Sequence, residues 1–214
     1  MSKMFFEDAI GRSYVGSAWI VGPRAFVTAA HCVWDDSEGE LFRNIVAVPA
    51  FQGPGDDGFG ATRVAVHPGY IDSAGRQSCY DLAVFTVDEN VANEFGSLGF
   101  DASGNITGDK VEAIGFPANP RPIRGEADPE VFAFDGNSMW HSVGDSTGTD
   151  GDIHSAENEM TGGCSGGAWV EEGTSIAIGL NSFRLVPHDN RMFSPVFDDD
   201  FMLLINWLRQ QGEL

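Results

Sequence analysis

The stretch YVGSAWIVGPRAFVTAAHCVW, residues 14–34, contains two apolar segments on either side of Gly22-Pro23. A Gly-Pro pair is a turn signal, because glycine adopts backbone angles that other residues avoid and proline has a fixed φ. Short apolar segments joined by such a turn are typical of paired β-strands. We therefore predict two strands here, and the second apolar segment ends at a histidine, His31.

The rest of the chain repeats this pattern, and its 214 residues include 27 glycines and 10 prolines. Such a turn-rich composition favours many short strands over long helices. We predict further strands at 44–51, 61–70, 81–87, 110–117, 130–136, 167–173, 175–183 and 191–197.

Residues 198–211 differ from the rest of the chain. Their apolar side chains Phe201, Leu204, Ile205 and Leu208 recur at helical spacing. Aspartates precede them, at the end where a helix dipole favours negative charge. The sequence therefore predicts an all-β chain that ends in an amphipathic α-helix.

Composition limits the functions that the chain could have. Hydrophobic residues make up 42% of it, enough for a sizeable core, and no apolar run is long enough to span a membrane. There are 32 acidic and 12 basic residues, for a formal net charge of −20. Such a surface repels phosphate backbones, so we expect no nucleic-acid partner. Solubility and adaptation to high salt both remain open as reasons for this charge.

The cysteines and the N-terminus give limited information about the compartment. Cys32, Cys79 and Cys164 are an odd number, so at least one thiol is unpaired within the chain, and no CxxC pair suggests zinc. The N-terminal sequence MSKMFFEDAIG lacks the features of a signal peptide. An intracellular protein and a secreted chain without its leader both remain open.

The stretch MTGGCSGGAW, residues 160–169, places Ser165 among four glycines. Glycine costs stability in a structural element and is kept where the backbone is unusual or is approached closely. A glycine-rich turn is the simplest interpretation of these ten residues. The alternative is a nucleophilic serine, which needs a histidine as its base and a carboxylate to orient that histidine.

Of the five histidines, His31 has the most suitable surroundings, because it ends an apolar strand. It is either a core residue with a hydrogen-bond partner or a base. His67 precedes a proline, and the polar surroundings of His141, His154 and His188 are typical of surface loops.

Asp81 opens the apolar strand at 81–87, where an ionised carboxylate must find a partner. A neighbouring imidazole would satisfy both groups. Asp81 is therefore the candidate partner of the histidine.

Each of the three candidate residues, His31, Asp81 and Ser165, stands within a short motif. TAAHC (28–32), DLAV (81–84) and GGCSGG (162–167) resemble the catalytic signatures of the trypsin/chymotrypsin-like serine peptidases, in the chain order of that family. VHPGY (66–70) and INWLRQQ (205–211) are similar to further segments of the same family.

Smaller motifs suggest a branch within that family. SLGF (97–100), AIGFP (113–117) and SMW (138–140) look most like the bacterial glutamyl endopeptidases.

The resemblance implies a fold and a site. The fold would be a single domain, 1–214, of two perpendicular six-stranded β-barrels, about 1–105 and 106–214, with the helix at the end and the active site between the barrels. The catalytic residues would be His31, Asp81 and Ser165, and the N–H groups of Gly163 and Ser165 would form the oxyanion hole. The family needs no metal or organic cofactor, its partners are polypeptide substrates, and we expect a monomer.

The chain departs from the family at its cysteines. Cys164 stands where animal members often have an aspartate that pairs with a newly cut N-terminus, so we do not expect that activation route. The usual disulfide partner of Cys32 is absent, because Val15 or its neighbours stand there. A Cys32–Cys79 bond is one alternative, and buried free thiols are the favoured one.

By the same analogy, Glu159, Met160, Asn181, Ser182 and Phe183 bind the substrate. The glutamyl branch has a hydroxyl residue at the place of Met160 and a histidine near that of Asn181, so we predict no strict glutamate preference. The main chain of Ser182 and Phe183 would pair with extended substrate, and the Ser182 hydroxyl would support Asp81.

Glu159 stands at the position of the acidic selector of trypsin-like enzymes, which suggests arginine or lysine before the cut. Arg184 and Arg191 would neutralise the pocket if they line it. Glu159 facing solvent is the equal alternative.

Two other interpretations complete the list of functions. The active peptidase competes with a latent or inactive binding module on the same fold. Zinc hydrolysis through His31 and Cys32 lacks further spaced ligands.

The aspartates of 145–152 suggest calcium binding, but they lack the EF-hand pattern, so a solvated loop is favoured.

Overall fold

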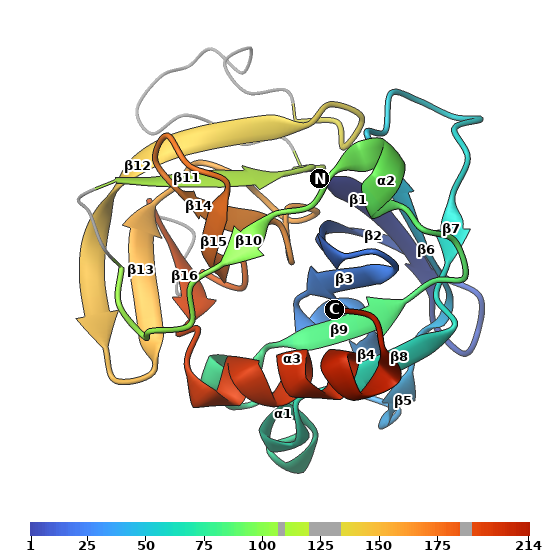
Figure 1. Cartoon of the computed structure of the whole chain (residues 1–214), viewed down its shortest axis with the longest axis horizontal. Helices are drawn as coiled ribbons and strands as arrows, with labels where there is room; N and C mark the ends of the chain where they lie inside the picture. The colour runs from blue at the N-terminus through green and yellow to red at the C-terminus, as the bar shows by residue number, and fades with distance from the viewer. Residues whose placement is uncertain (107–109, 120–133, 185–189) are drawn as a thin grey trace.

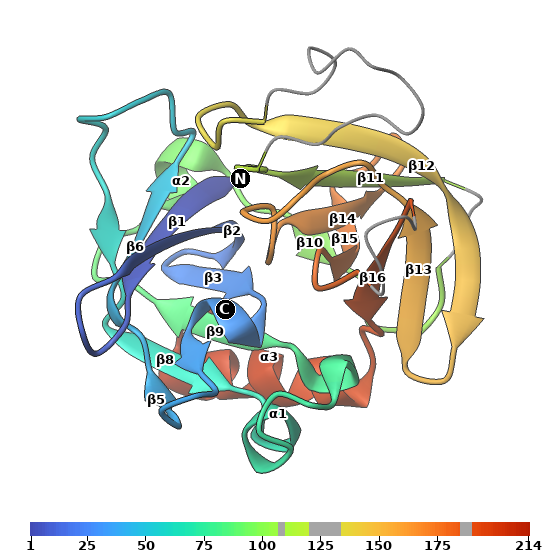
Figure 2. The same ribbon diagram turned by 180° about the vertical axis from the view of Figure 1, so that it is seen from behind.

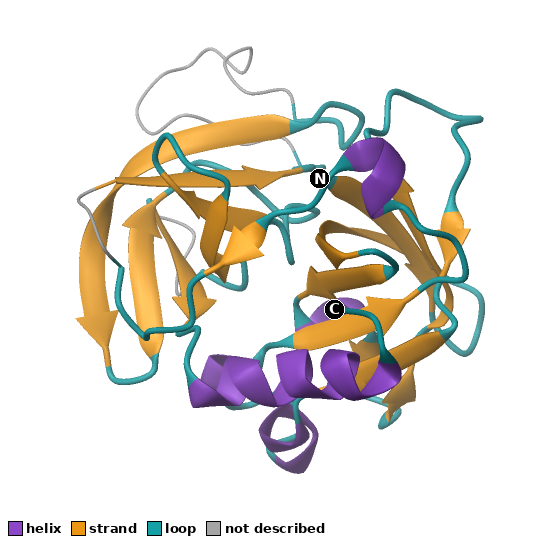
Figure 3. Ribbon diagram, in the orientation of Figure 1, coloured by secondary structure: helices purple, strands orange, loops and turns teal. Residues whose placement is uncertain are grey.

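Two curled β-sheets make up most of the molecule, and they stand beside each other in Figures 1 and 2. The computed structural model describes residues 1–106, 110–119, 134–184 and 190–214. Within these residues each sheet has six longer strands and one edge strand of two residues. The expected all-β fold with a C-terminal helix is confirmed, and Figure 3 shows how little of the chain is helical.

The first sheet has the strand order β7-β6-β1-β2-β3-β9-β8. Strands β2 and β3 are the pair expected around Gly22-Pro23. A separate two-stranded ribbon of β4 and β5 and the short helices η1, α1, η2 and α2 lie in its connections. The bounds are β1 Ser2–Glu7, β2 Ser13–Gly22, β3 Ala25–Thr28, η1 Ala30–Cys32, β4 Trp34–Asp35, β5 Glu40–Leu41, β6 Arg43–Pro49, β7 Phe59–Gly60, β8 Arg63–Val66, α1 Pro68–Asp72, η2 Ser78–Tyr80, β9 Ala83–Thr86 and α2 Ala92–Phe95.

The second sheet has the order β10-β15-β14-β11-β12-β13-β16. All its neighbouring strands are antiparallel except β10 and β15. Its strands are β10 Gly99–Phe100, β11 Lys110–Gly115, β12 Trp140–Asp150, β13 Ile153–Glu157, β14 Ala168–Glu171, β15 Ile176–Leu180 and β16 Arg191–Pro195.

Three of the longer strands, β1, β12 and β13, were not expected, and neither were the two-residue strands β4, β5, β7 and β10. The supposed loop at 145–152 is the end of β12 with its turn into β13. His141 and His154 accordingly lie on strands, exposed and buried respectively, rather than in surface loops. His188 and most of the strand expected at 130–136 lie outside the described residues, and 134–136 forms no strand.

The largest hydrophobic core is shared between the two sheets. Trp19, Phe26 and Phe85 are fully buried in the first sheet, and Phe26 stacks on Phe85 with ring centroids 4.9 Å apart. Leu180 of the second sheet belongs to the same cluster. Burial of this apolar surface therefore holds the two sheets against each other.

Helix α3, Asp199–Gln211, closes the first sheet on the side of β8 and β9 (Figure 1). The Asp198 side chain caps it by accepting the Asp200 N–H at 2.9 Å. The four apolar residues expected to share one face are all buried in the core. After the helix, Glu213 forms a bidentate ion pair with Arg24, at 2.8 and 3.0 Å. The end of the chain is thereby tied to the β2–β3 turn.

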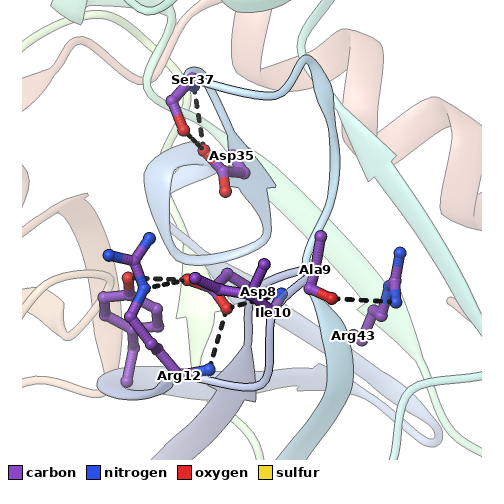
Figure 4. A network of polar contacts seen from close by, with 8 residues as sticks. Asp8, Ala9, Ile10, Arg12, Asp35, Ser37 and Arg43 are labelled. Atoms are coloured by element: carbon purple, nitrogen blue, oxygen red, sulfur yellow. Dashed lines mark hydrogen bonds and ion pairs between the residues drawn. The ribbon is translucent and has the colours of Figure 1, made fainter.

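Asp8 organises the turn between β1 and β2 (Figure 4). Its carboxylate accepts the main-chain N–H groups of Ile10 and Arg12, the Arg12 Nε–H at 2.5 Å and the Tyr14 hydroxyl. Burial raises the pKa of the carboxyl, but these hydrogen bonds, those from Arg12 foremost, outweigh it and lower the pKa to about 2. This turn leads into β2, where Gly16 lies against Cys32 and Ser17 hydrogen-bonds to the loop that carries Ser165.

We expect Asp8→Asn to lower the melting temperature by several degrees at pH 7, because the amide cannot accept all four donors. The folded pKa of Asp8, about 2, lies below the unfolded value of about 3.9. Its contribution to stability is therefore present above pH 4 and is lost as the pH falls towards 2. Thermal unfolding followed by circular dichroism from pH 2 to 7 should show the two proteins converge in acid. The exposed Asp72→Asn is the control, and an equal deficit at pH 2 and pH 7 would contradict this account.

Candidate active site

The pairing of β3 with β9 brings His31 and Asp81 together. In this antiparallel ladder Thr28 lies opposite Ala83. His31 follows β3 within the helical turn η1, and Asp81 stands between η2 and β9. Because the chain leaves β3 and enters β9 at the same end of the ladder, two residues 50 positions apart become neighbours.

Asp81 is held by three donors from two parts of the chain. Its Oδ2 lies 2.8 Å from His31 Nδ1 and accepts the Ser182 hydroxyl at 2.5 Å, and its Oδ1 accepts the His31 main-chain N–H at 2.9 Å. The carboxylate is almost completely buried, whereas 36% of the His31 side chain is exposed. The ring therefore has one edge fixed by Asp81 and another side open to solvent.

The ionisation of this pair follows from the same contacts. Burial raises the pKa of Asp81, but the His31 charge and the hydrogen bonds from His31 and Ser182 lower it below its ordinary value. Burial lowers the pKa of His31, but the charge and hydrogen bond of Asp81, with a contribution from Cys32, raise it well above its ordinary value. The site thus stabilises the imidazolium form, which a general base must reach after it accepts a proton.

The loop that carries Ser165 is clamped against the first sheet through its main chain. The Ser165 carbonyl accepts the Ser17 N–H at 2.8 Å and lies 3.6 Å from the Cys32 thiol, next to His31. The Ser17 hydroxyl donates to the Gly163 carbonyl at 2.9 Å and accepts the Phe116 N–H at 3.0 Å. Sequence reasoning missed Ser17, because nothing in its neighbourhood indicates partners so far along the chain.

The glycines around Ser165 are required by backbone angle and close contact. Gly163 and Gly166 have φ values of 99° and 83°, which strain any other residue. A Cβ at Gly163 would lie 2.6 Å from the Phe116 carbonyl oxygen, and one at Gly166 would lie 2.2 Å from Thr28 Oγ1. Side chains at either position would push the loop away from its neighbours.

Several main-chain donors between Thr161 and Ser165 have no acceptor among the described residues. They include the N–H groups of Gly163 and Ser165, both in a partly exposed part of the loop. Adjacent donors without a protein acceptor suit a developing negative charge on an oxygen atom. No hydrogen bond joins Ser165 Oγ to His31 Nε2 within the described residues, and such bonds are often long before substrate binds.

All three cysteines are free. A Cβ added at Gly16 would lie 2.9 Å from Cys32 Sγ, so Gly16, a neighbour of Val15, is the residue across from Cys32. Burial raises the pKa of the Cys164 thiol to about 12, so this neighbour of Ser165 stays protonated. Cys32 and Cys79 do not pair, in line with the favoured alternative of free thiols.

Two of the expected substrate-binding residues are buried in the core. Met160 is 1% exposed and packs in the core of the second sheet. Asn181 is fully buried, and its Oδ1 accepts Trp169 Nε1 at 2.8 Å and Asn158 Nδ2 at 2.9 Å. These side chains stabilise the second sheet. Glu159, which was expected in the same pocket as Met160, is half-buried.

The main chain after β15 is largely used within the protein. The N–H groups of Ser182 and Phe183 both donate to the Phe193 carbonyl, at 3.0 and 3.4 Å, and the Phe183 carbonyl accepts the Phe193 N–H at 2.9 Å. Both polar main-chain groups of Phe183 are thus used within the protein, which differs from the expectation that they pair with substrate. The Ser182 carbonyl accepts no hydrogen bond from the described residues.

A family model described as a trypsin-like peptidase domain matches residues 16–180 of this chain. The chain belongs to that family. The matched region contains His31, Asp81 and Ser165, with the hydrogen-bonded pair and the clamped loop described above.

A curated relative is the glutamyl endopeptidase of Bacillus licheniformis, which is 26% identical over 112 residues. The match covers 50% of this chain and spans about a third, 34%, of the length of that relative.

Solved structures confirm the fold. A thermostable serine protease, AL20, from an extremophilic microorganism superposes with a TM-score of 0.78 at 23% identity, over 96% of this chain and 94% of its own. Protease Anisep from Arthrobacter nicotinovorans gives 0.77 at 23% identity, over 96% and 93%. An inactivated protease paralogue of the scabies mite gives 0.69 at 13% identity, over 98% and 94%. The trypsin-like peptidase domain thus has a chymotrypsin-type fold.

Metal and membrane features are limited in the part of the chain that the structure describes. No group of three or more histidine, cysteine, aspartate or glutamate side chains there is arranged to hold a metal ion. No helix within the described ranges combines the length and the apolar character needed to cross a membrane.

We expect Gly16→Cys to form a disulfide with Cys32. In a disulfide the Cβ of one cysteine lies about 3 Å from the sulfur of the other, and the geometry at Gly16 already gives 2.9 Å. Closing a loop of about 15 residues stabilises a fold by about 3 kcal/mol in the chain-entropy model.

The measurements are a thiol titration under denaturing conditions, which should find two free thiols, and a melting temperature that rises only without reductant. Gly16→Ser is the control. Four free thiols after mild oxidation would show that the two side chains do not meet.

Proposed function

We propose that this protein is a serine endopeptidase that hydrolyses peptide bonds through Ser165, His31 and Asp81 with an acyl-enzyme intermediate. The single observation that supports it best is the buried Asp81 carboxylate bonded to His31 at 2.8 Å. A carboxylate in this place fixes the tautomer of the ring and stabilises the imidazolium. Family membership and the match to the Bacillus licheniformis enzyme support the same activity.

In the proposed reaction His31 Nε2 takes the proton of Ser165 Oγ, which attacks the carbonyl carbon of the peptide bond. Asp81 keeps the other ring nitrogen, Nδ1, as a donor. The new oxyanion is held by the N–H groups of Gly163 and Ser165, which have no acceptor among the described residues. His31 then protonates the leaving amine, and water hydrolyses the acyl-enzyme by the reverse sequence of proton transfers.

The substrates would be polypeptides, and the chain would act without a metal or organic cofactor. The Ser182 hydroxyl donates to Asp81, and the carbonyl of the same residue accepts no hydrogen bond from the described residues. We infer that it accepts the N–H of the residue before the cleaved bond.

The second candidate is a binding module with the same fold and no catalysis. The inactivated mite paralogue shares the fold, which supports this second candidate. The intact hydrogen bonds between His31, Asp81 and Ser182 favour the enzyme, since a binding module has no need of them.

A fluorophosphonate probe distinguishes the two candidates, because it labels only a serine that a base activates. We expect mass spectrometry to find the label on Ser165 of the wild type. His31→Ala should slow labelling by at least 100-fold, because the loss of a base costs about 10²–10⁴ in rate. His141→Ala, on an exposed strand position, is the matched control and should be labelled like the wild type. Well-folded wild-type protein that takes no label would favour the binding module.

The pH dependence tests the pairing with Asp81. His31 must be neutral to accept a proton, and its pKa is raised well above 6.5. We therefore expect kcat/KM on a peptide substrate to rise with pH through a pKa above that value. Asp81→Asn removes the charge that raises the pKa, so the acid limb should move to lower pH. Its kcat should fall about 10⁴-fold, as expected when the ring loses its orienting carboxylate. An acid limb that stays in place would contradict the assignment of Asp81.

A further inference from the structure

The Arg184 side chain links its own segment, which follows β15, to residues 158–160 and to the start of β16. Its Nε and Nη2 donate to the Met160 carbonyl, at 3.1 and 2.6 Å. Nη2 also donates to the Asn158 carbonyl, and Nη1 lies 3.4 Å from the Arg191 carbonyl. The guanidinium is thus bound to the chain before Ser165 and to the start of β16, while its own backbone follows Phe183.

These segments are the ones that would surround the side chain of the substrate residue before the cleaved bond. Residues 158–160 lead into the Ser165 loop. Residues 182–184 begin with the serine that binds Asp81, and their main chain pairs with β16 through Phe183 and Phe193. A side chain that is hydrogen-bonded to both of these segments occupies the space between them.

The wall opposite Arg184 is fixed in place. The Met160 N–H donates to Asn158 Oδ1 at 2.8 Å, and Asn158 Nδ2 donates to the buried Asn181 at 2.9 Å. Trp169 Nε1 completes this network at Asn181. The carbonyls of Asn158 and Met160 are therefore held in fixed positions. Arg184 hydrogen-bonds to these fixed acceptors. Because the side chains of Met160 and Asn181 are buried in this wall, neither of them sets the free volume beside Arg184.

We propose that Arg184 is a specificity-determining residue that fills the primary pocket and restricts the residue before the cleaved bond to small, uncharged side chains such as glycine, alanine or serine. The inference rests on the proposed function and names the substrate class of that site. Longer side chains would have to displace a guanidinium held by charge-assisted hydrogen bonds.

The test compares peptides that differ only at the residue before the cleaved bond: alanine, serine, leucine, phenylalanine, glutamate and arginine. We expect the wild type to cleave after alanine and serine with the highest kcat/KM. Arg184→Ala should raise the kcat/KM for leucine and phenylalanine, each taken relative to that for alanine, at least 10-fold. Arg184→Gln keeps most of the side chain without its charge and should keep the small-residue preference. Arg209→Ala, on the exposed face of α3, is the control and should match the wild type.

Three results would overturn the inference. One is a wild type that cleaves after leucine or phenylalanine as fast as after alanine, which can be measured even if Arg184→Ala fails to fold. Another is a preference for glutamate that both Arg184→Ala and Arg184→Gln abolish, which would make Arg184 a ligand for acidic side chains. The third is wild-type protein without fluorophosphonate label, in which case the peptidase function fails and the pocket with it. A labelled enzyme with the wrong profile would refute only the role of Arg184.

Discussion

The burial of the Asp81 charge is the constraint on which the rest of the structure depends. An ionised carboxylate that is 3% exposed is tolerated only with a full set of donors. The first sheet supplies two of them from His31, and the second sheet supplies the Ser182 hydroxyl, just after β15. The charge is therefore satisfied only when the two sheets are in contact. The orientation of the imidazole follows directly from this requirement.

A second link between the sheets acts through Ser17. Its N–H holds the Ser165 carbonyl, and its hydroxyl bridges the Gly163 carbonyl and the Phe116 N–H. The loop is thus fixed by its carbonyl groups, while the N–H groups of Gly163 and Ser165 have no acceptor among the described residues. Glycine at 163 and 166 makes this arrangement possible, since both positions combine positive φ with close neighbours.

Short-range signals predicted a large part of this arrangement. The β2–β3 pair follows from its apolar segments and turn, and α3 follows from its periodicity. The His31–Asp81 and Ser182–Asp81 contacts were expected from the family motifs and are present. β12 escaped prediction because its sequence, WHSVGDSTGTD, is mostly polar and largely exposed, so it lacks the apolar alternation that marks a strand.

Long-range packing could not be predicted in the same way. The two partners of the Ser17 hydroxyl lie 99 and 146 residues away, and no local pattern indicates them. Analogy placed Met160 and Asn181 in contact with substrate, whereas both are buried in the second sheet. Which face of a segment packs inward depends on neighbours distant in the chain, here Trp169 and Asn158.

The position of α3 has a consequence for the order in which the molecule can fold. Phe201, Leu204, Ile205 and Leu208 complete the core of the first sheet, and Glu213 is paired with Arg24. The first sheet leaves the ribosome early, but the helix that covers it is synthesised more than a hundred residues after β9. During translation the first sheet therefore carries an uncovered apolar surface until residues 199–211 emerge, and that surface makes the nascent chain prone to aggregation for the interval.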